Sequence, residues 1–184
     1  MASIKRRRNN SREVILDAAE QVAVKRGAGK VSLDSVAEEA GLTKGGVLYS
    51  FPSKEALIEG MLTRLTSTYQ PLFEQAWTER QGQANPSIKA SVQVTRQLDD
   101  LHPNIAMAIL AAAAQNLSML DPLREQFARR YRKISTESKD PQLATALWAA
   151  AEGLMLMHML GLLPFDHTEK AAVLQRIEAL AEDV

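Results

Sequence analysis

Apolar side chains recur along this chain at the spacing of one face of a helix, in one segment after another. Between Ser11 and about Arg26, one face of the expected helix carries Val14, Ile15, Ala18, Ala19 and Val22. A shorter segment after Ser32 repeats the pattern with Leu33, Val36, Ala37 and Ala40. Alanine and leucine are frequent and β-branched residues seldom cluster. The pattern predicts an all-α protein.

Capping residues and helix breakers divide the pattern into about nine helices. The first four are expected to begin after Ser11, Ser32, Thr43 and Ser53, and the first three to end near Gly27, Gly41 and Phe51-Pro52. Four more are expected over about 87–101, 104–118, 122–138 and 141–162, and a last one after Pro164, with Val173, Leu174, Ile177 and Leu180 as its apolar face.

Composition narrows the class of protein. Hydrophobic residues make up 46% of the 184 residues, enough for a substantial core. Cysteine is absent, which excludes disulfide scaffolds and thiolate metal sites. The three histidines, His102, His158 and His167, lack the spacing of metal ligands, and we expect no metal and no cofactor. The apolar segment 146–163 contains Glu152 and Gly153, so we expect a buried helix of a cytoplasmic protein and no membrane span.

Charge is distributed unevenly although the formal net charge is zero. Residues 1–65 contain 11 lysines and arginines against 8 acidic residues, and the remainder contains 11 against 14. The first third is therefore the better candidate for a nucleic-acid partner. Residues 1–10 are interpreted as a basic flexible arm, which either solubilises the chain or reaches DNA through Arg6, Arg7 and Arg8.

The segment from Ser32 to Phe51 has the pattern of a helix-turn-helix. Two short helices are joined by a tight turn at Gly41, and the small Ala37 lies four positions before that glycine. Val36 and Val47 are spaced to meet where the two helices cross. The second helix of such a pair can enter the major groove of DNA with its N-terminus leading, where free N–H groups attract phosphate.

The residues that follow resemble the signature of the TetR (tetracycline-repressor) family. The resemblance rests on Lys44-Gly-Gly-Val-Leu-Tyr-Ser-Phe-Pro-Ser-Lys-Glu-Ala-Leu57 and on the first-helix segment Val14-Ile-Leu-Asp-Ala-Ala19. It covers residues 11–65; the remainder is similar in length and helical character. It implies a three-helix DNA-binding domain over 11–52, a connecting helix over 53–80, a helical ligand-binding and dimerisation domain over 81–184, and a homodimer.

The resemblance also implies which residues contact DNA. By position they are Ser32, Thr43, Lys44, Gly45, Tyr49 and Lys54. The amide of Gly46 at the same helix N-terminus and the side chain of Val47 on the same helix are added as further candidates. Tyr49 could instead belong to the core, but its place at a helix end and its polar tip favour contact with DNA. Many family members carry a side chain at the position of Gly46, and its absence removes one possible base contact.

The second half offers candidates for a ligand pocket and a dimer interface. We expect a small hydrophobic ligand near Phe73, Trp77, Met107, Asn116, Trp148, Glu152 and Met155. Methionine and tryptophan at helical spacing are as readily explained as core residues. The last two helices have more apolar surface than one subunit can cover, and their interface residues are predicted to be Leu154, His158, Val173, Ile177 and Leu180.

The function predicted from these features is a ligand-responsive transcriptional regulator, most simply a repressor that a small hydrophobic molecule releases from a near-palindromic DNA operator. An activator of the same fold is an alternative. An all-α enzyme is disfavoured because the chain has no P-loop, dinucleotide fingerprint, Gly-x-Ser-x-Gly or His-Glu-x-x-His motif. A non-specific architectural DNA binder is disfavoured because the net charge is zero.

Overall fold

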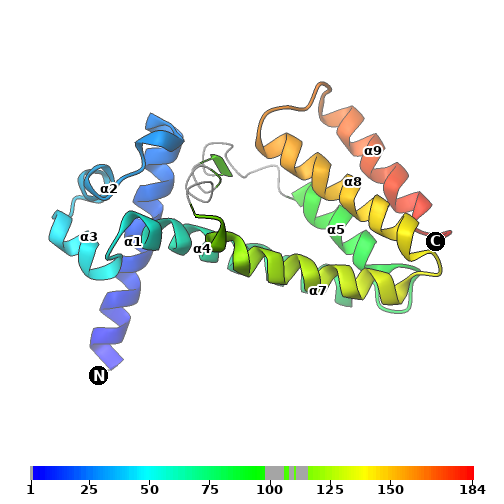
Figure 1. The fold of residues 1–184 in the computed structure, drawn as a ribbon, viewed down its shortest axis with the longest axis horizontal. Helices are drawn as coiled ribbons and strands as arrows, with labels where there is room; N and C mark the ends of the chain where they lie inside the picture. The colour runs from blue at the N-terminus through cyan, green and yellow to red at the C-terminus, as the bar shows by residue number, and fades with distance from the viewer. Residues whose placement is uncertain (1, 98–105, 108–109, 111–115) are drawn as a thin grey trace. The chain divides into compact units, whose positions relative to one another are not determined.

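The computed structural model describes residues 2–97, 106–107, 110 and 116–184, and these residues form helices and turns without a β-strand (Figure 1). Eight α-helices and two short 3-10 turns lie in the described part of the chain, so the predicted all-α fold is confirmed. The described residues divide into two compact units, the first within residues 1–65 and 102–119 and the second within residues 66–101 and 120–184. In the described ranges no helix combines the length and apolarity that a membrane crossing requires.

The first unit is built from three helices and the beginning of a fourth. These are α1 (Ala2–Arg26), α2 (Leu33–Ala40), α3 (Lys44–Ser50) and the first part of α4 (Lys54–Thr78), with a 3-10 turn at Ala28–Lys30 after α1. Helix α1 packs against both α2 and α3. Helix α4 continues into the second unit without a break in its helical assignment.

Helix α1 begins earlier than the sequence analysis placed it. We expected an arm over residues 1–10 and a helix from Ser11, whereas the helical backbone begins at Ala2. No glycine or proline occurs between Ala2 and Arg26, so nothing in the sequence interrupts propagation of the helix toward its N-terminus.

The turn between α2 and α3 is fixed by local hydrogen bonds. Ser32 caps α2 in a capping box, in which its hydroxyl accepts from the Ser35 N–H at 3.2 Å and its own N–H donates to Ser35 Oγ at 3.0 Å. Gly41 ends α2 with a left-handed φ of 65°, a conformation that costs glycine little. Thr43 then caps α3 by accepting from the Gly46 N–H at 3.1 Å. The helix-turn-helix geometry therefore follows from short-range signals.

Phe51 anchors the end of α3 in the core of the first unit. Its side chain is fully buried, and the guanidinium of Arg12 lies 4.2 Å from its ring centroid while donating to the Ser50 carbonyl at 3.3 Å. The ring also lies against Gly60 of α4, where an added Cβ would come within 2.5 Å of Phe51 Cε1. Gly60 is thus required by close packing against an aromatic ring.

The second unit contains the remainder of α4 together with α5 (Pro86–Gln97), α7 (Asp121–Glu137), α8 (Pro141–Met159) and α9 (His167–Leu180), and a 3-10 turn at Leu117–Leu120 precedes α7. Helices α5, α8 and α9 lie side by side, and α7 packs on α5 and α8 (Figure 1). Their shared core includes Ile88, Ile134, Leu147, Trp148, Leu154, Leu174 and Ile177. The helix expected over 104–118 lies mostly outside the described residues.

We predict that Gly60→Ala lowers the free energy of unfolding by about 1–3 kcal/mol, because a buried aromatic ring has no space to move away from the new methyl group. Urea denaturation followed by circular dichroism measures this change. The matched control is Gly45→Ala in α3, where the added Cβ would meet only Thr43 Oγ1 at 3.9 Å and the helix propensity of alanine should raise stability. Equal stability of Gly60→Ala and the unsubstituted protein would contradict the assigned role of Gly60.

Candidate nucleic-acid interface and effector site

The N-terminal end of α3 forms an exposed polar surface. Thr43, Lys44, Gly45 and Gly46 are all exposed, and Tyr49 one turn further on is 74% exposed. An exposed aromatic ring of this size beside free helix N–H groups is suited to contact with a nucleic-acid backbone. The exposure of Tyr49 excludes the alternative that it is a core residue of this chain.

Lys44 has a partner that the sequence analysis did not anticipate. Its Nζ lies 3.0 Å from Asp34 Oδ2 in the first turn of α2, and both side chains are more than half exposed. An exposed pair of this kind contributes little to stability. The ammonium of Lys44 is therefore held near the N-terminus of α3 while remaining free to exchange Asp34 for a phosphate.

The prediction that Val47 contacts DNA is wrong. Its side chain is fully buried, together with that of Val36 on α2. A helix of seven residues must bury one side to hold its position, and Val47 lies on that side. The exposed residues predicted from the motif are thereby reduced to Thr43, Lys44, the two glycines and Tyr49.

The two glycines at the start of α3 are not required by the fold. An added Cβ at Gly45 would meet Thr43 Oγ1 at 3.9 Å, and one at Gly46 would meet it at 3.4 Å. Both are ordinary contacts, and neither glycine has a positive φ. The absence of side chains here leaves the backbone accessible for close approach of a large ligand.

Two more of the predicted DNA contacts, Ser32 and Lys54, lie at the starts of α2 and α4. Ser32 is half-buried and engaged in the cap of α2, whereas Lys54 is the first residue of α4, after Ser53, whose Oγ accepts from the Ala56 N–H at 3.1 Å. Helix N-termini favour anions, so a lysine at such a place adds to the attraction for phosphate.

Three other basic residues of the first unit, Lys25, Arg26 and Arg64, are paired with carboxylates. Lys25 lies 2.6 Å from Glu39 and Arg26 lies 2.7 Å from Glu38, which ties the end of α1 to α2. The hydrogen bond from Lys25 holds the pKa of Glu39 below its ordinary value. Earlier in α1, Asp17 pairs with Arg64 of α4, which also lies within 3.7 Å of Glu13. These pairs connect helices of the first unit.

The residues predicted to bind a ligand are distributed over two clusters of the second unit and over the first unit. Phe73 is buried, and Trp77 and Met155 pack with it against α5, whereas Trp148 belongs to the core formed by α5, α8 and α9. Met107 and Asn116 are exposed residues of the first unit. Within the second unit the structure therefore brings together Phe73, Trp77 and Met155 in one cluster and places Trp148 in the other.

Charged side chains of α7 contact residues of both clusters of the second unit. Arg130 lies 4.0 Å from the ring centroid of Phe73 and 2.9 Å from Glu152 Oε1, which also accepts from Trp148 Nε1 at 2.9 Å. The sequence analysis missed Arg130. On the same face of α7, Glu137 accepts from Trp77 Nε1 at 2.8 Å and from the Ser87 N–H at 2.9 Å, so it caps the start of α5.

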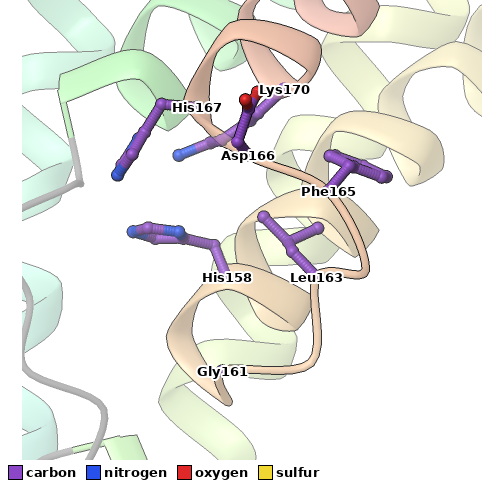
Figure 2. Close-up of a pocket in the computed structure, with 7 residues that line it drawn as sticks. All are labelled: His158, Gly161, Leu163, Phe165, Asp166, His167 and Lys170. Carbon is purple, nitrogen blue, oxygen red and sulfur yellow. The ribbon is translucent and has the colours of Figure 1, made fainter.

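Two hollows open on the second unit away from these residues. One, of about 460 Å³, lies between α4 and α7 and is lined mostly by polar residues, namely Thr66, Ser67, Gln70, Pro71, Pro122, Glu125, Gln126 and Arg129. The other, of about 220 Å³, lies between the end of α8 and the start of α9 (Figure 2). In it the rings of His158 and His167 lie edge to face, with centroids 5.8 Å apart. None of the predicted ligand-binding residues lines either hollow.

Two of the predicted interface residues are placed in the core of the subunit instead. Leu154 and Ile177 are 9% and 5% exposed, so they have almost no surface left for a partner subunit. Leu154 was misassigned because α8 is apolar on nearly all sides, and its sequence does not indicate which side is covered. Ile177 was misassigned because the apolar face of α9 packs on the core of its own subunit. His158 and Leu180 are half-buried, and Val173 is exposed.

The side of α8 opposite that core is also apolar. We call it the exposed α8 face; it consists of Leu143, Ala146, Ala149, Ala150, Gly153, Leu156 and Met157. Leu143, Leu156 and Met157 are each more than a third exposed in the single chain. A continuous apolar face of this kind marks an interaction surface.

Comparison with known proteins gives matches to two family models. Residues 15–61 match the model described as bacterial regulatory proteins of the tetR family. Residues 85–182, more than half of the chain, match the model described as the tetracycline repressor-like C-terminal domain. The two matches follow each other in the order of the two halves of such regulators.

Individual relatives agree with this assignment. The HTH-type transcriptional regulator TtgR of Pseudomonas putida is 33% identical over 69 residues, which is 38% of this chain and 33% of TtgR. The chain thus matches about a third of the length of that curated relative.

Solved structures share the fold over almost the whole chain. The crystal structure of SCO7518 from Streptomyces coelicolor A3(2) covers 95% of this chain and 99% of its own, with 22% identity and a TM-score of 0.69. That of the multidrug binding protein EbrR in complex with ethidium covers 91% of this chain and 98% of its own, with 23% identity and a TM-score of 0.63. The family models, the capped helix-turn-helix and the shared fold lead to one conclusion: the chain belongs to the TetR family of bacterial transcriptional regulators.

Proposed function

We propose that this regulator is a homodimeric repressor that binds a near-palindromic operator and is released from it by a small organic molecule. The observation that carries the DNA-binding half of the proposal is the surface of α3, where a capped helix N-terminus exposes Thr43, Lys44 and Tyr49 while Val47 is buried behind them. Binding to chromosomal DNA would place the protein in the cytoplasm.

The α3 surface matches the requirements of major-groove binding. The helix is short, its first turn carries two glycines, and its exposed cation is held at the leading end by Asp34. Two such helices in a dimer would read half-sites about 34–36 Å apart. Lys54 at the start of α4 would contact the phosphate backbone and would contribute to affinity without discriminating between sequences.

Replacement of Lys44 by alanine is expected to abolish preference for the operator while leaving the circular dichroism spectrum unchanged, because the pair with Asp34 is exposed and contributes little to folding. Asp34→Asn is the matched variant: it removes the competing carboxylate and should strengthen DNA binding severalfold. Fluorescence anisotropy with labelled operator, at fixed salt, measures both affinities.

Lys54→Ala provides the contrast, since loss of a phosphate contact should weaken binding to all sequences alike and reduce the salt slope by about 1. Full operator affinity in Lys44→Ala would show that α3 does not carry the recognition surface.

The exposed α8 face supports the dimer. A stable interface needs more than about 1,000 Å² of complementary surface, and an apolar helix face with alanine and glycine permits close approach of a second helix. Val173 of α9 is exposed as well and extends the candidate surface. We propose that the exposed α8 face and Val173 pair with the same residues of a second copy.

Ala150→Glu should convert the dimer into a folded monomer, because it introduces a charge into a desolvated contact without disturbing the subunit core. Ala128→Glu, on an exposed position of α7, is the control that should remain dimeric. Sedimentation velocity distinguishes the two states. A dimer of undiminished stability in Ala150→Glu would move the interface to another surface.

Response to a ligand is proposed from the family and from the interior of the second unit. Crystal structures of EbrR contain imidazole, ethidium or malachite green, and EbrR is described as a multidrug binding protein. In this chain, Phe73 and Trp77 lie on α4, the same helix whose first residues pack on Phe51. A ligand that binds beside Phe73 and prefers the arrangement that cannot bind DNA would release the operator.

Trp77 and Trp148 are the only tryptophans and both lie in the second unit, so their emission reports on this interior. An effector should quench or shift the emission, and Trp77→Phe should remove much of that signal if the ligand binds beside α4. The same titration with labelled operator should show release over the same concentration range. Tight quenching without any change in operator affinity would contradict the coupling through α4.

A further inference from the structure

Two cations of α7 lie on aromatic rings of α4. The guanidinium carbon of Arg130 is 4.0 Å from the ring centroid of Phe73, and the ammonium of Lys133, one turn further on, is 4.0 Å from that of Trp77. A cation at such a distance over a ring is attracted by the negative face of its π-system. Each of these two rings of α4 therefore already binds a cation of α7.

The side chains around Arg130 are those expected of a binding site for a cation. Glu152 of α8 lies 2.9 Å from Arg130 Nη1 and is itself held by Trp148 Nε1 at 2.9 Å. The side chains of Arg130 and Glu152 are only 10% and 12% exposed, and Phe73 is 2% exposed. Phe73 and Glu152 contact the guanidinium, and Trp148 holds Glu152 in place; we name these three residues the Glu152 cage.

Stability alone does not explain this arrangement. Removing two charges from water is costly, and a buried ion pair is often replaced by apolar residues of similar volume without loss of stability. A ring face opposed by an oriented carboxylate, with an indole N–H fixing that carboxylate, is instead the arrangement that recognises a planar organic cation.

We propose that the Glu152 cage is a binding site for an organic cation with an aromatic body, and that Arg130 is its internal occupant, which the ligand displaces. This inference rests on the proposed function, since the displacing cation would be the effector. Arg129 and Tyr131, its neighbours in the chain, are exposed, so solvent lies within reach of the long Arg130 side chain once it leaves the cage.

Competition by Arg130 has a measurable consequence. A ligand that binds only when Arg130 has left the cage has an apparent affinity lowered by the small fraction of molecules in that state. Removal of the internal cation should therefore strengthen binding, whereas removal of the carboxylate should weaken it. Displacement would also break the link that Arg130 makes between α8 and Phe73 of α4, which gives the cation a means of acting on α4.

The test uses two probes of the same shape, 2-naphthylguanidinium and the neutral 2-naphthylurea, titrated into the full chain by isothermal calorimetry. The guanidinium should bind at least tenfold more tightly than the urea. Arg130→Met, which keeps the apolar stem, should strengthen its binding by tenfold or more, and Glu152→Gln should weaken it by a similar factor. Arg129→Met, one residue away and exposed, is the control that should leave the affinity unchanged.

Equal binding of the two probes, or an Arg130→Met variant that binds the guanidinium no better than the unsubstituted protein, would overturn the inference. If the Arg130→Met variant does not fold, the inference is tested by comparing the two probes in the unsubstituted protein and in the Glu152→Gln variant. Operator affinity is measured in parallel. If the protein still binds its operator and an uncharged compound releases it, only the proposed cation site is refuted. Absence of operator binding would refute the proposed function itself.

Discussion

The exposed surface of α3 depends on the burial of two side chains on its opposite side. A helix of seven residues is too short to be stable in water by itself, so α3 keeps its shape only because Val47 and Phe51, four residues apart, are buried. Phe51 in turn fits only because Gly60 of α4 has no side chain. The orientation of Lys44 and Tyr49 toward a partner therefore follows from an aromatic ring packed on a glycine.

The helix that carries Gly60 also contributes side chains to the interior of the second unit. Helix α4 runs from Lys54 to Thr78, and its later turns carry Phe73 and Trp77, which contact cations of α7. Pro71 lies between these two parts and cannot donate a backbone hydrogen bond within the helix. Under the proposed mechanism, a ligand at Phe73 would act on the same helix whose early turns pack against Phe51.

Local signals explain why much of the fold could be predicted. Ser32, Gly41 and Thr43 determine the caps and the turn through hydrogen bonds within a few residues, and the structure has helices where these residues place them. Contacts between distant residues could not be predicted in the same way. Gly60 gives no sign in the sequence that Phe51 will pack on it, and Leu154 lies on a helix that is apolar on nearly every side.

Polar residues inside the second unit were missed for a related reason. Arg130, Lys133 and Glu137 recur at helical spacing on α7, a pattern that normally indicates a face in water. Here that face is covered, because aromatic rings and carboxylates of other helices satisfy the charges. Only the three-dimensional arrangement distinguishes a solvated charged face from an internal network.

Selection of bound duplexes from a random pool by the purified full chain, followed by sequencing, tests whether the exposed end of α3 reads a specific DNA sequence as one of a symmetric pair. We expect enrichment of one near-palindromic site with half-sites about one helical turn, or a small offset from it, apart. A pool that stays random after repeated rounds, or enrichment of a single asymmetric half-site, would contradict it.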